Sequence, residues 1–157
     1  HIIKSLPYLN QINDKEFIIR VDSLNKRQKK IVTTSNNLLP IVGLRETHEK
    51  VMESDFIIAR GGFNTISECL IFQKPSLLFY ERRNPEIQQN LKNFYNSGFC
   101  DLLMDKDWGK NLDRTIDKFM KKKNTIYNNL KKQKYKDTGA KEIVQNIIKS
   151  MNNYKIS

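Results

Sequence analysis

The sequence contains few of the residues that bind metals or form disulfides. Among its 157 residues it has two cysteines, Cys69 and Cys100, and two histidines, His1 and His48. The cysteines match neither a zinc-binding spacing nor a disulfide framework, and two histidines are too few for a typical histidine-based metal site. The sequence therefore predicts no metal and no cofactor, and a reducing, cytoplasmic location.

Long apolar runs are also absent. No run approaches the ~18 residues of a membrane-spanning helix, and no basic-then-apolar leader resembles a signal peptide. The hydrophobic share of 38% is still enough for a core. We find no internal repeat or linker, so the length predicts one domain over residues 1–157, too short for a two-lobed enzyme of ~300 residues.

Acidic residues are scarce relative to basic ones, with 17 Asp and Glu against 28 Lys and Arg and a formal net charge of +11. This balance is typical of proteins that bind nucleic acids or anionic membranes. Lys, Asn and Ile together make up 56 residues, so much of the charge follows from a compositional bias. Residues 118–136 contain eight lysines without any aromatic or RNA-binding pattern. We interpret them as a solvated helix face, with an anionic membrane or a partner subunit as alternatives.

Short apolar runs alternate with segments of helical period. Five runs predict strands, at residues 16–22, 39–44, 55–59, 76–80 and 99–104. Helices are predicted near Asn64, from Pro85 to Gly98, from Leu112 to Met120 with a continuation to Leu130, and from Gly139, while residues 45–47 are predicted as a polar turn. The alternation favours an α/β fold with a Rossmann-like parallel sheet and helices on both faces.

Residues 55–68, DFIIARGGFNTISE, place a buried strand before two glycines and the start of a helix. Gly61 and Gly62 let the backbone turn and approach a ligand without a Cβ in the way. Asn64 and Thr65 are both suited to cap the helix that follows. For the glycines alone, an ordinary strand-to-helix turn is the alternative.

Two charged residues flank this turn. Arg60 adds a bidentate donor beside the helix start, where free N–H groups and the positive end of the helix dipole already favour an anion. Glu68 lies one helical turn further on and is placed to accept hydrogen bonds from sugar hydroxyls, although a solvated helix residue is the alternative. A phosphate site beside a diol acceptor describes a nucleotide site.

The string RGGFNTISE at 60–68 resembles the donor-binding half of GT-B glycosyltransferases, above all the family 28 C-terminal domain. The stretch NPEIQQN at 84–90 is similar to that family's H-P-E-x-x-Q-N segment. The resemblance spans about residues 16–149 and is specific from 54 to 90. It implies the C-terminal half of a GT-B fold, which binds a UDP-sugar donor (UDP-GlcNAc or a related UDP-hexose) for an inverting, metal-independent transfer in cell envelope polysaccharide biosynthesis.

The resemblance also implies roles for individual residues. Glu68 would bind the ribose, the backbone around Leu44 and Arg45 would contact the base, and Gln88 and Gln89 would bind hydroxyls of the transferred sugar. No catalytic residue is implied within this chain. The donor diphosphate would lie against Arg60, Gly61, Gly62, Phe63, Asn64 and Thr65.

The sequence departs from the family pattern at its start. The Gly-rich loop and the strand before it have no match, and residues 1–9 resemble the helix that follows that loop. We expect residues 16–22 to pair directly with 55–59, or another chain to fill the place of the missing strand. The acceptor lobe, which normally supplies the catalytic base, is expected in cis or as a separate subunit, so this chain alone is not expected to transfer a sugar.

Several alternatives remain open at this point. A UDP-sugar hydrolase shares the same donor domain, and a non-catalytic basic module would bind nucleic acid or an anionic membrane instead. We expect no nucleic-acid partner, a cytoplasmic protein with peripheral contact at the inner membrane face, and self-association through exposed apolar surface. The sequence specifies neither the sugar nor the acceptor.

Overall fold

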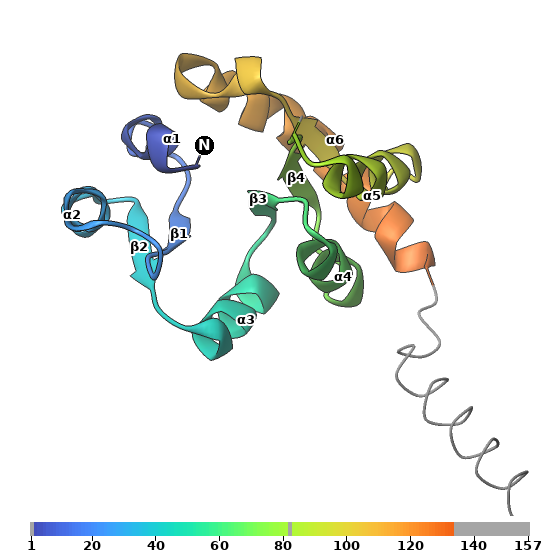
Figure 1. The fold of residues 1–157 in the computed structure, drawn as a ribbon, viewed down its shortest axis with the longest axis horizontal. Helices are drawn as coiled ribbons and strands as arrows, with labels where there is room; N and C mark the ends of the chain where they lie inside the picture. Colours follow the sequence, from blue (N-terminus) through green and yellow to red (C-terminus); the bar gives the residue numbers. More distant parts are fainter. Residues whose placement is uncertain (1, 82, 134–157) are drawn as a thin grey trace, which may run out of the picture.

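The computed structural model describes residues 2–81 and 83–133. Figure 1 shows the strands at the centre of the molecule with helices around them. Each strand overlaps a predicted run, and every pairing among the strands is parallel, which confirms the α/β class. The strands are β1 (Phe17–Arg20), β2 (Leu38–Ile41), β3 (Ile57–Arg60), β4 (Ser76–Phe79) and β5 (Asp101–Leu103).

Helices follow the strands in the alternation that the periodicity predicts. Two were not expected: α2, where Asn25 and Gln28 form a capping box, and α3, which replaces the predicted polar turn at residues 45–47. The helix predicted from Gly139 lies outside the described residues. The helices are α1 (Ile2–Leu9), α2 (Lys26–Thr33), α3 (Leu44–Glu53), α4 (Phe63–Ile71), α5 (Pro85–Asn96) and α6 (Leu112–Lys132), with short 3-10 turns η1 (Asp105–Asp107) and η2 (Gly109–Asn111).

The strands form two sheets rather than one. β1 pairs with β2, and a separate sheet has the order β3-β4-β5. Direct pairing of the strand at 16–22 with the strand at 55–59 was therefore a wrong expectation: within the described residues, β1 and β3 each have a neighbour on one edge only. The packing of α1 against α6 and η2 joins the two parts, and one continuous hydrophobic core runs through both.

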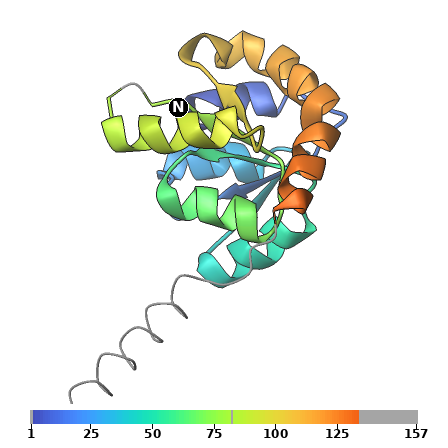
Figure 2. The ribbon, with the colours of Figure 1, turned by 90° about the vertical axis from the view of Figure 1, so that its right-hand side faces the viewer.

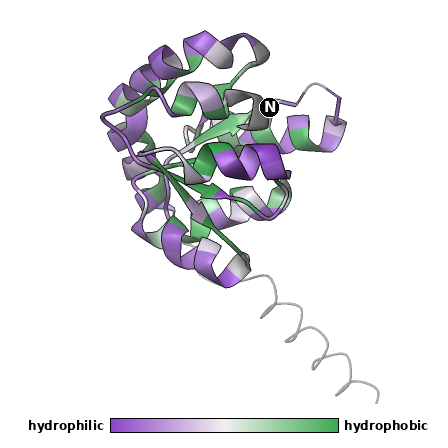
Figure 3. Cartoon of the chain, turned by 90° about the vertical axis from the view of Figure 1, so that its left-hand side faces the viewer, coloured by the Kyte–Doolittle hydropathy of each residue, from purple (hydrophilic) through white to green (hydrophobic). Residues whose placement is uncertain are grey.

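The burial of the strands follows from this division. All four residues of β4, the central strand of the three-stranded sheet, are buried. The three apolar residues of β3 are only partly buried, although a continuous apolar run is typical of a strand covered on both faces. Figure 3 shows the apolar strands inside a more hydrophilic layer of helices.

Helix α5 begins and ends as predicted. The Asn84 side chain accepts a hydrogen bond from the Ile87 N–H, and Pro85 occupies the first helical position. At the other end Gly98 has a φ of +72°, and the Phe99 N–H bonds to the Phe94 carbonyl. This is the Schellman arrangement that a glycine after a helix favours.

Helix α6 is one continuous helix whose lysines contact the rest of the fold. Lys122 pairs with Asp101 at 2.7 Å and Lys123 with Asp55 at 3.2 Å. Two lysines of the lysine-rich segment therefore form ion pairs with residues at the start of β5 and just before β3. Within residues 2–81 and 83–133, no helix combines the length and apolar character that crossing a membrane requires. The buried face of α6 comprises Leu112, Ile116, Phe119, Ile126 and Leu130.

Candidate functional site

The candidate site begins where β3 ends and α4 starts. Gly62 is the residue that precedes the helix, with φ −71° and ψ 161°, and it has no side chain to cap the first turn. Asn64 and Thr65 lie inside the helix, so the prediction that either caps it was wrong. The first N–H groups of a helix have no acceptor within it, and here no capping side chain takes one. They remain suited to an anion.

The two glycines have different functions in the fold. A Cβ on Gly61 would lie 2.2 Å from Leu91 Cδ2, so this residue allows α5 to pack closely against the end of β3. A Cβ on Gly62 would have no atom within 4 Å. Of the two, Gly62 is the position where a ligand can approach the backbone.

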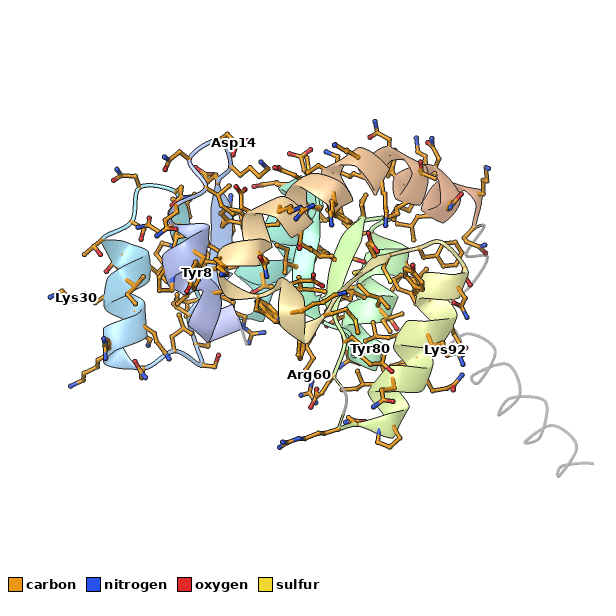
Figure 4. The ribbon with its side chains drawn as sticks, turned by 90° about the horizontal axis from the view of Figure 1, so that it is seen from above. Tyr8, Asp14, Lys30, Arg60, Tyr80 and Lys92 are labelled. Carbon is orange, nitrogen blue, oxygen red and sulfur yellow. The ribbon has the colours of Figure 1, made fainter. Side chains whose placement is uncertain are left out.

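Arg60 lies at the carboxyl end of β3 and is already paired. Its Nε donates to Glu81 Oε2 at 2.6 Å, and the two side chains are 59% and 30% exposed. Figure 4 shows Arg60 at the rim of the molecule, on the side where α5 begins. A guanidinium has five N–H donors, so four remain for an anion after this bond.

A shallow pocket of about 270 Å³ lies where the amino ends of α4 and α5 meet. The two helices lie side by side in Figure 2 and are in contact. Four of the predicted diphosphate residues line this pocket; Gly61 and Asn64 do not. Sequence reasoning assigned no ligand contact to the other three lining residues, Asn84, Glu86 and Ile87, although all three belong to the NPEIQQN segment at the start of α5. The lining comprises Arg60, Gly62, Phe63, Thr65, Asn84, Glu86 and Ile87.

Glu68 lies on α4 and contacts α3. Its Oε1 is 3.2 Å from Nε2 of His48, and the two side chains are 36% and 47% exposed. The neighbouring Cys69 is buried, and burial raises the pKa of its thiol to about 11. That thiol stays protonated at neutral pH and is not an activated nucleophile.

Leu44, expected as the last residue of a strand run, and Arg45, expected in the polar turn, are the first two residues of α3. The helix begins here because Gly43 takes the left-handed φ of +81° and its N–H donates to the Asp22 carboxylate. Glu46 in the first turn accepts a hydrogen bond from the backbone N–H of Val42. The backbone N–H groups of residues 44 and 45 therefore belong to an open helix start, which suits a contact to a carbonyl of a base.

Gln88 and Gln89 lie on α5 and do not line the pocket. The Tyr80 hydroxyl donates to Gln88 Oε1 at 3.4 Å, and Gln89 Nε2 donates to Asn93 Oδ1 at 3.0 Å. Both amides thus contact protein groups, and their predicted function at the sugar stays a prediction. In the part of the chain that the structure describes, no three His, Cys, Asp or Glu side chains gather as a metal site would require.

Comparison with known proteins identifies the family. The glycosyltransferase family 28 C-terminal domain matches residues 2–149 of this chain, which includes the β3–α4 turn, the pocket and α5. The match covers nearly the whole chain and agrees with the resemblance found in its motifs.

A curated relative is similar over part of its length. The UDP-N-acetylglucosamine--N-acetylmuramyl-(pentapeptide) pyrophosphoryl-undecaprenol N-acetylglucosamine transferase of Clostridium botulinum is 32% identical over 108 residues. The aligned region covers 66% of this chain and 30% of the relative. The chain therefore spans about a third of the length of the enzyme that it matches.

Proposed function

Because the chain belongs to the glycosyltransferase family 28 C-terminal domain, we propose that it binds the nucleotide-sugar donor of an inverting, metal-independent glycosyl transfer. The donor is UDP-GlcNAc or a related UDP-hexose, as the name of the C. botulinum relative suggests. The observation that carries the proposal is the pocket between the amino ends of α4 and α5, with Arg60 at its edge.

The diphosphate binds at the start of α4. The N–H groups of Phe63, Asn64 and Thr65 are the first of the helix, and the positive end of its dipole adds to their attraction for an anion. Gly62 leaves room for a phosphate against the backbone, and Arg60 has donors left after its bond to Glu81. Both features favour a ligand with two phosphates over a single small anion.

The nucleoside extends from the diphosphate toward α3. Glu68 accepts hydrogen bonds from the ribose hydroxyls, and the backbone at Leu44 and Arg45 contacts the base. Glu68 lies at the junction of α3 and α4, which the His48–Glu68 contact marks, and Leu44 and Arg45 begin the same helix α3 that carries His48. The sugar lies over the amino end of α5, where Asn84 and Glu86 offer polar groups and where Gln88 and Gln89 are the predicted contacts.

The transfer itself requires groups from outside this chain. We expect an acceptor lobe, in cis or as a separate subunit, to supply the catalytic base and complete the reaction. The acceptor of the C. botulinum relative carries an undecaprenol group, so we expect this chain to act in peripheral contact with the inner membrane face. A hydrolase with the same donor domain would use the same contacts and differ only in that other lobe.

Titration with UDP and UDP-GlcNAc tests the proposal. We expect saturable binding that falls by about 1–3 kcal/mol, roughly fivefold to 150-fold, in Glu68→Ala, because a charged hydrogen-bond acceptor is lost. Glu16→Ala is the matched control, since Glu16 is an exposed carboxylate at the amino end of β1. Equal affinity of Glu68→Ala and wild type would refute the ribose contact. Salt-dependent binding of polynucleotides without binding of UDP would refute the proposed function.

A further inference from the structure

A histidine on α3 contacts the carboxylate that we assign to the ribose. His48 Nε2 and Glu68 Oε1 are 3.2 Å apart, although the residues are separated by 20 positions in the sequence. The imidazole also lies against Phe72 at the end of α4, with ring centroids 6.2 Å apart. Two contacts to the same helix therefore fix the position of the ring next to Glu68.

The chemistry of this pair fits a positioning function. With a proton on Nε2, the imidazole donates to one oxygen of the carboxylate. A carboxylate has about four lone-pair positions, so the second oxygen stays open for a pair of hydroxyls. A glutamate that is already held in place loses less side-chain entropy when it binds a ligand.

Other carboxylates on α3 have different partners. Glu49 pairs with Arg45 at 3.3 Å, and Glu46 accepts from the backbone at Val42. Among the contacts of the described residues, Glu68 is the carboxylate that His48 reaches. His48 also lies four residues, about one helical turn, after Leu44, where the base is expected.

We propose that His48 is a positioning residue for the nucleoside: it orients Glu68 toward the ribose hydroxyls. This inference rests on the proposed function, because it assumes that Glu68 accepts those hydroxyls. It adds a residue from α3 that the sequence motifs do not include. It also makes α3 the element that couples the base contact to the ribose contact.

The test compares UDP with its 2′,3′-dideoxy analogue, which lacks both hydroxyls. Affinities are measured by calorimetry for wild type, His48→Ala, His48→Gln, Glu68→Ala and the His48→Ala/Glu68→Ala double variant. We expect wild type to prefer UDP, and His48→Ala to lower UDP affinity about three- to tenfold with little change for the dideoxy analogue. In His48→Gln, an amide N–H can replace Nε2, so this variant restores most of the affinity. In the Glu68→Ala background, His48→Ala should have no further effect.

The outcomes separate this inference from the proposed function. If Glu68→Ala loses UDP affinity but His48→Ala keeps the full preference for UDP, the positioning function is refuted and the proposed function stands. If His48→Ala weakens both ligands equally, the histidine acts only on the fold and the inference is again refuted. If wild type binds neither ligand, both proposals are refuted.

Discussion

Replacement of Gly61 by alanine is the sharpest test of how α5 is positioned against the site. The added Cβ would lie 2.2, 2.5 and 2.8 Å from Cδ2, Cγ and Cδ1 of Leu91. Nonpolar carbons pack at about 3.5–4.0 Å, so the leucine would have to move by about 1.3 Å or more. Leu91 has no exposed surface and lies on the buried face of α5 between Ile87 and Phe94. Because Leu91 is fully buried, its displacement would disturb the core around it.

The expected cost follows from these contacts. Overpacking of a core typically costs about 1–3 kcal/mol, and the change from glycine to alanine returns about 0.4–1 kcal/mol by restricting the unfolded chain. We therefore expect Gly61→Ala to lower the free energy of unfolding by about 1–2 kcal/mol. Gly62→Ala is the matched control, because its Cβ meets no atom within 4 Å and its φ is −71°. The gain from restricting the unfolded chain is offset here because alanine is a poorer N-cap residue than glycine, so the net effect should stay within about 0.5 kcal/mol.

Urea denaturation followed by circular dichroism measures both changes by linear extrapolation. Leu91→Ala provides a second check: it is itself destabilising, by about 2–5 kcal/mol, but it removes all three clashing atoms. In that background Gly61→Ala should cost nothing. Equal stability of Gly61→Ala and wild type, or a full additional loss in the Leu91→Ala background, would refute the reasoning from the Gly61–Leu91 contact.

Two further predictions concern Arg60 and the buried thiols. Glu81→Gln should raise the affinity for UDP about two- to fivefold, and more at low salt, because it removes a carboxylate 2.6 Å from Arg60. Calorimetry at two salt concentrations measures this change in affinity. Unchanged affinity at low salt would contradict the prediction. Burial raises the pKa of Cys69 to about 11, whereas an unfolded thiol has a pKa of about 8.5. The contribution of the protonated Cys69 thiol to folding stability is therefore complete below about pH 8.5. It is lost as the pH rises toward 11, because the unfolded chain loses the thiol proton at lower pH than the folded chain does. Urea titrations at pH 8, 9.5 and 10.5 should show a smaller decline for Cys69→Ala than for wild type; parallel declines would count against this assignment.

Much of the fold is readable from local sequence because its strands are short apolar runs and its helices carry local end signals. Pro85 and Gly98 mark the two ends of α5, and the structure places them there. The start of α3 was missed because its signal is not local. Gly43 takes a left-handed conformation and donates to Asp22, which is 21 residues away in the sequence. Without that contact, the polar residues after Gly43 are typical of a turn.

Prediction of the candidate site was limited in the same way, by contacts between residues far apart in the sequence. The motif from Arg60 to Glu68 identifies the residues at the start of α4, and four of the six predicted diphosphate residues line the pocket. The motif cannot identify the partners of its two charged residues. Glu81 and His48 lie 21 and 20 positions away from Arg60 and Glu68 in the sequence. Such pairings depend on how strands and helices pack, which spacing within one segment does not encode.

The division of the sheet bears on how the proposed donor would be held. The pocket is built from β3, α4 and α5, all on the side of the three-stranded sheet, whereas the proposed base contact lies on α3 and the proposed ribose contact, Glu68 of α4, is paired with His48 of α3. Helix α3 lies in the chain between the two sheets and forms hydrogen bonds to residues near each of them. Gly43 at its start bonds to Asp22 after β1, and Lys74 after α4 donates to the carbonyls at its end. Since β1 and β3 do not pair, these contacts and the helix packing must set the distance between the base contact and the diphosphate contact. In the proposed binding mode, recognition of the whole nucleotide therefore depends on the junction between the sheets, whereas recognition of its diphosphate does not.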